Sequence, residues 1–276
     1  MLGTDLCPIL EERHEVVPLG RVDADVTDLE ALLRAFREHQ AGVVIHAAAE
    51  TDVDGCEGDP DHAYRVNGWG AWAAATAAEA VGARFVLISM DFVFDGESDR
   101  PYTEFDPVHP ISVYGTSKLA GEEAAQRACR RCTIVRTQWL YGRNGASFPR
   151  AILKAASGGG PLQVVADQVG SPTYTRHFAQ KLRWLIEQRC DGVYHFSNSG
   201  AASRWEWACE ILRLAGHREV EVQKARTSEF PRPARRPAYS VLRHLALEMR
   251  KADDIPAWQD GLSAFIDELK AAGEVV

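Results

Sequence analysis

Short apolar runs separated by longer amphipathic stretches dominate the first half of the chain. The runs are rich in β-branched residues and too short for helices, which predicts buried strands. They are His14–Leu19, Val43–Ala48, Phe85–Ser89 and Thr133–Thr137. Strands that alternate with helices in this way form a parallel sheet with helices on both faces. The pattern therefore predicts an α/β fold built on a doubly wound parallel sheet.

Three helix-length stretches follow or separate the predicted strands. One begins at Thr27-Asp-Leu-Glu30, a capping box in which the threonine hydroxyl and the glutamate carboxylate each accept a bond from a first-turn amide. A second runs from about residue 60 to 81 and stops at Gly82, and a third runs from Ser112 to about Arg127. An earlier helical pattern spans residues 4–13, where Pro8 should disturb it unless it lies in the first turn.

The second half of the chain has a looser rhythm. Two further strands are predicted at Val164–Gln168 and Gly192–Ser197. Ser203-Arg-Trp-Glu206 is a second capping box, which opens a helix to about residue 215. The proline-rich stretch Phe230–Ser240 predicts an ordered loop, and a last helix is expected over residues 258–271.

Composition and charge exclude several classes of protein. The 276 residues are 46% hydrophobic and 25% charged, as in an ordinary globular protein, which argues against disorder. The net charge of −8 comes from acidic residues spread along the chain, so we expect no nucleic-acid partner. No signal-like segment opens the chain and no run approaches about 18 apolar residues, so we expect a cytoplasmic protein without membrane contact.

Two of the six cysteines have the C-x-x-C spacing of redox and zinc sites, Cys129-Arg-Arg-Cys132. A zinc site needs a second pair of ligands, and none stands at a suitable spacing. We therefore interpret this segment as a helix end that runs into a strand, and expect no metal.

Tyr114-Gly-Thr-Ser-Lys118 is the strongest candidate for chemistry. Residues four apart share one face of a helix, so the phenol and the ammonium point into the same space. A nearby cation favours the ionised phenol, and such a tyrosine can protonate the alkoxide formed when a hydride is delivered to a ketone. The alternative is a surface pair worth a few tenths of a kcal/mol. The preceding strand, which ends in Ser89-Met-Asp91, favours chemistry.

A series of motifs in the same order as in a known family extends over nearly the whole chain. The sequence closely resembles the dTDP-4-dehydrorhamnose reductases, which belong to the extended short-chain dehydrogenase/reductase superfamily. The motifs are Ile88-Ser-Met-Asp-Phe-Val-Phe-Asp-Gly96, Pro101-Tyr102, Val113-Tyr-Gly-Thr-Ser-Lys-Leu-Ala-Gly-Glu122, Arg136-Thr-Gln-Trp-Leu-Tyr-Gly142, Asp167-Gln-Val-Gly-Ser-Pro-Thr-Tyr174, Gly192-Val-Tyr-His195 and Pro233-Ala-Arg-Arg-Pro-Ala238.

The resemblance implies a role for each matching position. Tyr114 and Lys118 match the proton donor and the lysine that binds the cofactor ribose. The matches to the adenosine side of the cofactor are Asp25 and Val26, those to the nicotinamide nucleotide are Ala49, Glu50 and Thr51, and those to the substrate are Asp91 and Trp139. From the residues alone, a core position is favoured for Trp139, and a turn or helix-start position for Asp25.

The resemblance also implies an activity and an architecture. It implies reduction of the 4-keto group of a dTDP-4-keto-6-deoxy sugar with NADPH, as in dTDP-L-rhamnose synthesis. NADH stays open as the cofactor, and a homodimer stays open as the oligomeric state. A Rossmann-like nucleotide-binding domain is expected over residues 1–141, and a smaller, mainly substrate-binding lobe over residues 142–276, with some segments returning to the main sheet. Two alternatives stay open: a regulatory nucleotide-binding protein on the same scaffold, and a reductase or epimerase of another nucleotide sugar.

Met90 departs from the family, which has a threonine at this position to polarise the substrate carbonyl. Methionine has no donor, and loss of such a donor typically costs a factor of about 10²–10³ in rate. Ser89 is a candidate substitute, but adjacent strand residues point to opposite faces unless the strand end twists.

The amino-terminal sequence is the second departure. The family opens with a strand and a glycine-rich turn that holds the cofactor diphosphate, whereas Met1-Leu-Gly3 resembles only the end of that turn. That strand lies in the middle of such sheets, so we expect the sheet to lack its first strand and two strands to face a gap. We therefore expect further residues upstream in the natural chain, and weak NADPH binding and poor solubility of the 276 residues alone.

Overall fold

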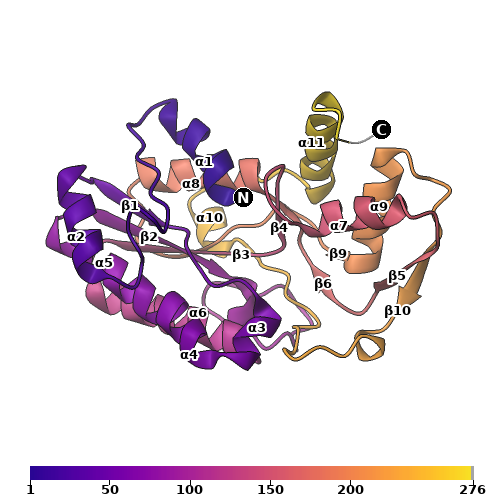
Figure 1. Ribbon diagram of the computed structural model, residues 1–276, viewed down its shortest axis with the longest axis horizontal. Coiled ribbons are helices and arrows are strands. Elements are labelled where there is room, and N and C mark those ends of the chain that lie inside the picture. The colour runs from indigo at the N-terminus through magenta and orange to yellow at the C-terminus, as the bar shows by residue number, and fades with distance from the viewer. Residues whose placement is uncertain (275–276) are drawn as a thin grey trace.

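A parallel four-stranded sheet forms the centre of the larger part of the protein (Figure 1). The structure is a computed structural model that describes residues 1–274. Its strand order is β1 (Val43–His46), β2 (Arg84–Met90), β3 (Cys132–Thr137) and β8 (Gly192–His195), and every neighbouring pair is parallel. The predicted α/β fold with a parallel sheet is confirmed.

Helices cover both faces of this sheet because its strand residues alternate between two apolar cores. Phe85 and Leu87 of β2 pack in the core that the sheet forms with α2 (Leu29–Glu38), α5 (Gly70–Ala80) and α6 (Val113–Ala128). Val86 and Ile88 pack on the opposite side with α1 (Leu2–Glu11), α8 (Thr175–Glu187) and α10 (Leu245–Met249). Figure 1 shows these two helical layers above and below the strands. A sheet buried on both faces accounts for the continuous apolar runs of the sequence.

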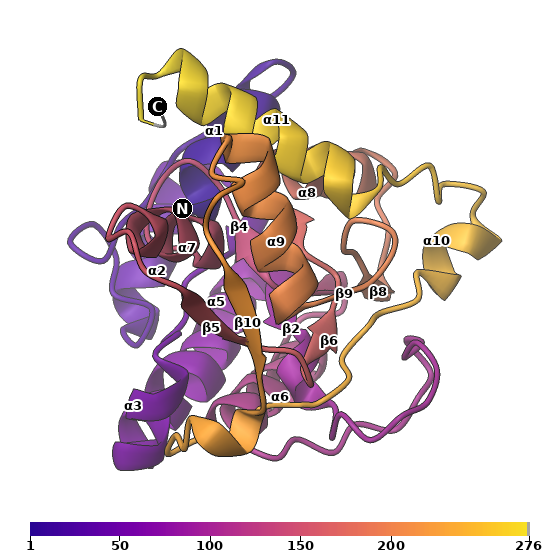
Figure 2. The same cartoon turned by 90° about the vertical axis from the view of Figure 1, so that its right-hand side faces the viewer.

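A second lobe contains α7 (Phe148–Ala156), α9 (Arg204–Ala215) and α11 (Trp258–Ala271), which lie toward the viewer in Figure 2. Its core is aromatic and includes Tyr141, Trp207 and Phe265. Three strand pairs complete it: β5 (Leu162–Val165) with β10 (Val222–Ala225), β4 (Leu140–Tyr141) with β7 (Thr173–Tyr174), and β6 (Val169–Gly170) with β9 (Ala202–Ser203). The boundary at residue 141 stays a prediction.

The strand predicted at His14–Leu19 does not form, and this prediction is wrong. Strand β1 pairs with β2 on one side only, and its other edge borders a groove of about 1190 Å³. Val16, Val17 and Leu19 line the far side of that groove. A strand is defined by hydrogen bonds to a neighbour, and the groove keeps this segment beyond bonding reach of β1.

Two expectations about the first two helices also differ from the structure. Pro8 lies inside α1 without ending it, because the one lost backbone bond is outweighed by burial of Leu6, Ile9 and Leu10. The cap of α2 is Asp28, which accepts from the Ala31 amide, rather than Thr27. The Thr27 hydroxyl and amide instead donate to Asp25 at 2.8 and 2.9 Å, which removes Thr27 from the cap position.

The remaining helix predictions are confirmed, with one local exception. Helix α6 starts after its cap Ser112, the capping box of Ser203 and Glu206 opens α9, and α11 has its predicted bounds. The stretch predicted as one helix from 60 to 81 is divided into α4 (Pro60–Ala63), a π turn η1 (Tyr64–Trp69) and α5, preceded by α3 (Val53–Gly58).

Cys129 is the carboxyl cap of α6 and Cys132 is the first residue of β3, which confirms the interpretation of the C-x-x-C segment as a helix end followed by a strand. Residues 230–240 form a loop with short 3-10 turn η3 (Thr227–Glu229) before it. Within residues 1–274, none of the helices combines the length and the apolar character needed to cross a bilayer.

Candidate active site

Tyr114 and Lys118 lie on the inner face of α6, against the carboxyl end of β2. Their side chains are buried, with 3% and 4% of each residue exposed. The Lys118 Nζ donates a hydrogen bond of 2.8 Å to the carbonyl oxygen of Ile88. The alternative of a solvated surface pair is therefore excluded, and the pair borders the edge of the sheet at which ligands bind in folds of this class.

The protonation of this pair differs from the expectation. Burial raises the pKa of Tyr114, and the negative charge of Asp91 adds to the rise, so the expected shift toward the ionised phenol is wrong. Burial lowers the pKa of Lys118 to about 8, opposed by the charge of Glu122. A phenol that keeps its proton at neutral pH suits a general acid, which must hold the proton until the alkoxide forms.

Two glycines of α6 allow it to approach its neighbours closely. A Cβ on Gly115 would lie 2.2 Å from the carbonyl oxygen of Phe92, in the 3-10 turn η2 (Asp91–Val93) after β2. A Cβ on Gly121 would lie 2.3 Å from the carbonyl oxygen of Asn67 in the π turn. Both contacts exclude any larger residue, so Gly115 sets the approach of α6 to the end of β2 and Gly121 sets its approach to the π turn.

Asn67 connects the catalytic helix to the loop after β1, and sequence reasoning did not find it. Its Oδ1 accepts from the Glu50 amide at 2.9 Å, and its Nδ2 donates to the Glu50 carbonyl at 3.2 Å and to Ser117 Oγ at 3.0 Å. Ser117 immediately precedes Lys118. The π turn places this side chain, and π turns occur often at functional sites. An asparagine inside the helical pattern of residues 60–81 was the available signal.

Unsatisfied polar atoms gather where β2 and β3 end. Ser89 Oγ, both carboxylate oxygens of Asp91, Thr137 Oγ1 and Gln138 Nε2 are buried and have no hydrogen-bond partner among the described residues. Burial raises the pKa of Asp91 to about 7, opposed first by the nearby Ser240 side chain and then by the charge of Arg204. Each unpaired buried group costs about 1–3 kcal/mol, so their concentration at one place marks a site for a polar ligand.

Met90 packs with Phe92 against the small cluster that contains Tyr114, Cys56 and Ala63. The thioether therefore lies on the tyrosine side, where the family has its threonine. Ser89 is fully buried, and its role as a substitute donor stays a prediction.

Trp139 adopts φ 44°, the left-handed region that large residues rarely occupy. Its ring stacks on Trp207 with 5.5 Å between centroids, and the Arg204 guanidinium carbon lies 3.6 Å from its centroid. A Cβ on Gly170 would come within 2.6 Å of the indole. Trp139 is 9% exposed within the core of the second lobe and contacts a cation that sequence reasoning missed, and its role as a substrate contact stays a prediction.

The expected cofactor residues lie in the groove beside β1 and in the loop that follows this strand. Gly3 and Val26 line the groove beside β1, together with Ala47 and Ala48. Asp25 is held by Thr27, whose amide bond is the main cause of its lowered pKa.

The loop after β1 carries the remaining cofactor candidates. Ala49 and Glu50 are partly buried, whereas Thr51 is exposed. With the groove and the buried Lys118, these residues fit a nicotinamide nucleotide at its adenosine and nicotinamide ends. The amino end of α1, near the exposed Gly3, would hold the diphosphate between these two ends.

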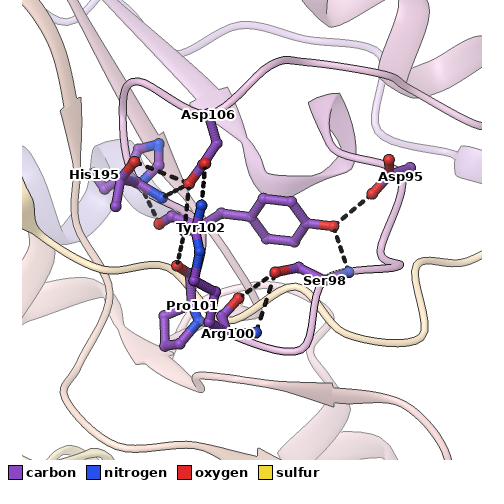
Figure 3. Close-up of polar contacts among 8 residues, drawn as sticks. Asp95, Ser98, Arg100, Pro101, Tyr102, Asp106 and His195 are labelled. Atoms are coloured by element: carbon purple, nitrogen blue, oxygen red, sulfur yellow. Dashed lines mark hydrogen bonds and ion pairs between the residues drawn. The ribbon is translucent and has the colours of Figure 1, made fainter.

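The loop between Asp91 and α6 is held by its own polar network (Figure 3). The Tyr102 hydroxyl donates to Asp95 at 2.5 Å and accepts from the amides of Gly96 and Ser98, both at 3.1 Å. The Tyr102 carbonyl oxygen lies 3.2 Å from Nδ1 of His195, at the end of β8. The Pro101-Tyr102 motif therefore anchors the loop to the sheet rather than contributing chemistry.

Comparisons with known proteins give a consistent result. Residues 1–271 match the family described as the RmlD substrate binding domain. The chain is 38% identical to the spore coat polysaccharide biosynthesis protein SpsK of Bacillus subtilis, over 98% of this chain and 95% of that protein. It is 37% identical to dTDP-4-dehydrorhamnose reductase of Streptomyces griseus, over 95% and 89%.

Solved structures agree. A dTDP-4-dehydrorhamnose reductase from Clostridium acetobutylicum superposes with a TM-score of 0.95 at 41% identity, covering 98% of this chain and 96% of that one. The reductase of Bacillus anthracis, solved in complex with NADP, gives 0.94 at 36% identity, covering 97% and 95%.

Proposed function

The chain belongs to the RmlD substrate binding domain family, and from that premise we propose that it reduces the 4-keto group of a dTDP-4-keto-6-deoxy sugar with NADPH, as dTDP-4-dehydrorhamnose reductases do. The observation that carries the proposal is the buried Tyr114–Lys118 pair beside unpaired Asp91 at the carboxyl ends of β2 and β3. The NADP complex of the Bacillus anthracis reductase supports the choice of cofactor.

NADPH, when bound, supplies the hydride that adds to carbon 4 of the sugar. Tyr114 Oη gives its proton to the oxygen of the former ketone, so one hydride and one proton are added. Lys118 holds the cofactor ribose and supplies positive charge beside the phenolate that remains. Asp91 accepts hydrogen bonds from sugar hydroxyls, which orients the ring.

The test measures NADPH consumption, followed by its absorbance, with a dTDP-4-keto-6-deoxyhexose as substrate. Removal of the phenol in Tyr114→Phe should lower kcat by about 10²–10⁴-fold, the range for loss of a positioned acid. Tyr64→Phe is the matched control, because Tyr64 is 41% exposed and loses only a solvated hydroxyl.

A calorimetric titration of NADPH accompanies the assay so that binding and chemistry are separated. A protein that binds NADPH but consumes none with this substrate would contradict the proposal. Such a result would favour the regulatory alternative or another nucleotide sugar.

A further inference from the structure

Arg204 is the first residue of α9, directly after its cap Ser203, and its side chain reaches into an aromatic cage. The guanidinium carbon lies 3.6 Å from the ring centroid of Trp139, 5.1 Å from that of Phe148 and 5.5 Å from that of Trp207. Stacking holds the planar group by its face and leaves its N–H edges free to donate.

This cation has no anionic partner within residues 1–274. Within these residues the Arg204 side chain forms no ion pair and no hydrogen bond, and the charges of Asp91 and Arg236 act on it only without direct contact. Burial lowers the pKa of Arg204 to about 9; the charge of Asp91 opposes this effect, and the charge of Arg236 adds to it. A guanidinium that is partly removed from water and unpaired is unfavourable, so the position indicates an anionic ligand.

Neither Asp54 nor Asp91 forms an ion pair with Arg204. Asp54 is already engaged by Arg236 at 2.9 Å and by Arg232 at 3.2 Å. Asp91 is close enough for its charge to act on Arg204, yet both its carboxylate oxygens are unpartnered. The site thus offers an acceptor and a donor whose charges interact but that form no ion pair with each other.

A nucleotide sugar presents both complementary groups at one point, because its pyranose hydroxyls adjoin the diphosphate. We propose that Arg204 binds the diphosphate of the nucleotide-sugar substrate, with Trp139 as the platform that orients the guanidinium. The inference rests on the proposed function, since the diphosphate is the anionic group of that substrate. Arg204 is then a specificity-determining residue that distinguishes nucleoside diphosphate sugars from uncharged sugars.

The test compares calorimetric affinities for dTDP and for thymidine, which lacks the phosphates. Arg204→Gln should weaken dTDP binding about 10- to 100-fold, the range for one or two charge-assisted hydrogen bonds, and leave thymidine binding unchanged. Arg204→Lys, which keeps the charge but loses the planar fork, should fall between wild type and Arg204→Gln. Arg235→Gln, at an exposed arginine nearby, is the control and should bind both ligands as wild type does.

Unchanged dTDP affinity in Arg204→Gln would overturn the inference and leave the proposed function intact. Equal losses for dTDP and thymidine would also overturn it, because they would show a structural role for Arg204. If Arg204→Gln does not fold, wild-type dTDP affinity in Arg204→Lys refutes the bidentate contact. A wild-type protein that does not bind dTDP at all would instead contradict the proposed function itself.

Discussion

Replacement of Asp91 by asparagine should make the protein more stable at high pH while it makes the proposed enzyme less active. The Asp91 carboxylate is buried, with 1% of the residue exposed, and neither oxygen has a hydrogen-bond partner in the described chain. Asparagine has nearly the same shape and does not ionise. The substitution therefore removes a buried charge while it preserves packing.

The size of the effect follows from the shift in protonation. Burial raises the pKa of Asp91 from 3.8 to about 7. The folded protein binds this proton more tightly than the unfolded chain, so ionisation of Asp91 destabilises the fold. A shift of about 3 units corresponds to about 4 kcal/mol. This penalty is absent below about pH 4, grows as the pH rises toward 7 and is complete above it.

Urea unfolding at pH 4.5 and at pH 8 measures the difference between Asp91→Asn and wild type. We expect a variant more stable by only about 1 kcal/mol at pH 4.5, and by about 4 kcal/mol at pH 8. Asp99→Asn is the control, because Asp99 is exposed and should show no difference at either pH. Equal stability of Asp91→Asn and wild type at pH 8 would refute the reasoning. The same variant should lower kcat/KM for the nucleotide sugar, because the amide replaces one of the two acceptor oxygens.

Three further outcomes are expected. Met90→Thr should raise kcat and leave nucleotide-sugar affinity nearly unchanged, because the hydroxyl acts where charge develops on the substrate carbonyl. A lower or unchanged kcat in a protein that binds NADPH would show that another group, such as Ser89, polarises this carbonyl. The buried side chains of Arg136 and Glu122 form an ion pair, with 2.6 Å between Nη2 and Oε2. Arg136→Met should therefore lower the free energy of unfolding by about 3–5 kcal/mol by leaving Glu122 buried and unpaired, whereas adding Glu122→Leu should recover most of it. Equally unstable single and double variants in urea would contradict this. Extension of the amino end by an apolar strand and a glycine-rich turn should tighten NADPH binding in a calorimetric titration. The strand would fill the groove beside β1, and the turn would add amides for the diphosphate. Equal affinities of the extended and original proteins would contradict this.

Local patterns predicted the parts of the fold that depend on neighbours in sequence. The spacing of Tyr114 and Lys118 placed both on one face of α6, and the box formed by Ser203 and Glu206 located the start of α9. The apolar run of β2 predicted a strand buried on both faces. These features follow from helical and strand periodicity, which a single sequence contains.

Features that depend on tertiary partners were not predictable in this way. Residues 14–19 have the composition of a strand but no bonded neighbour, and Thr27 gave up its capping role to bind Asp25. The π turn that carries Asn67 has no sequence signature. The rise of the Tyr114 pKa required knowledge of its burial, because the sequence shows the lysine four residues away but not the loss of water. Arg204 and Asp91 are far apart in the sequence, and only folding brings their charges close enough to interact.

The most direct test of the central claim follows the hydride. The protein is incubated with a dTDP-4-keto-6-deoxyhexose and NADPH that carries deuterium at the transferable position of the nicotinamide, and the sugar is analysed by mass spectrometry. We expect a reduced sugar with one deuterium at carbon 4 from wild type, and almost none from Tyr114→Phe at equal NADPH occupancy. Unlabelled sugar from a protein saturated with NADPH, or equal labelling by Tyr114→Phe, would contradict this.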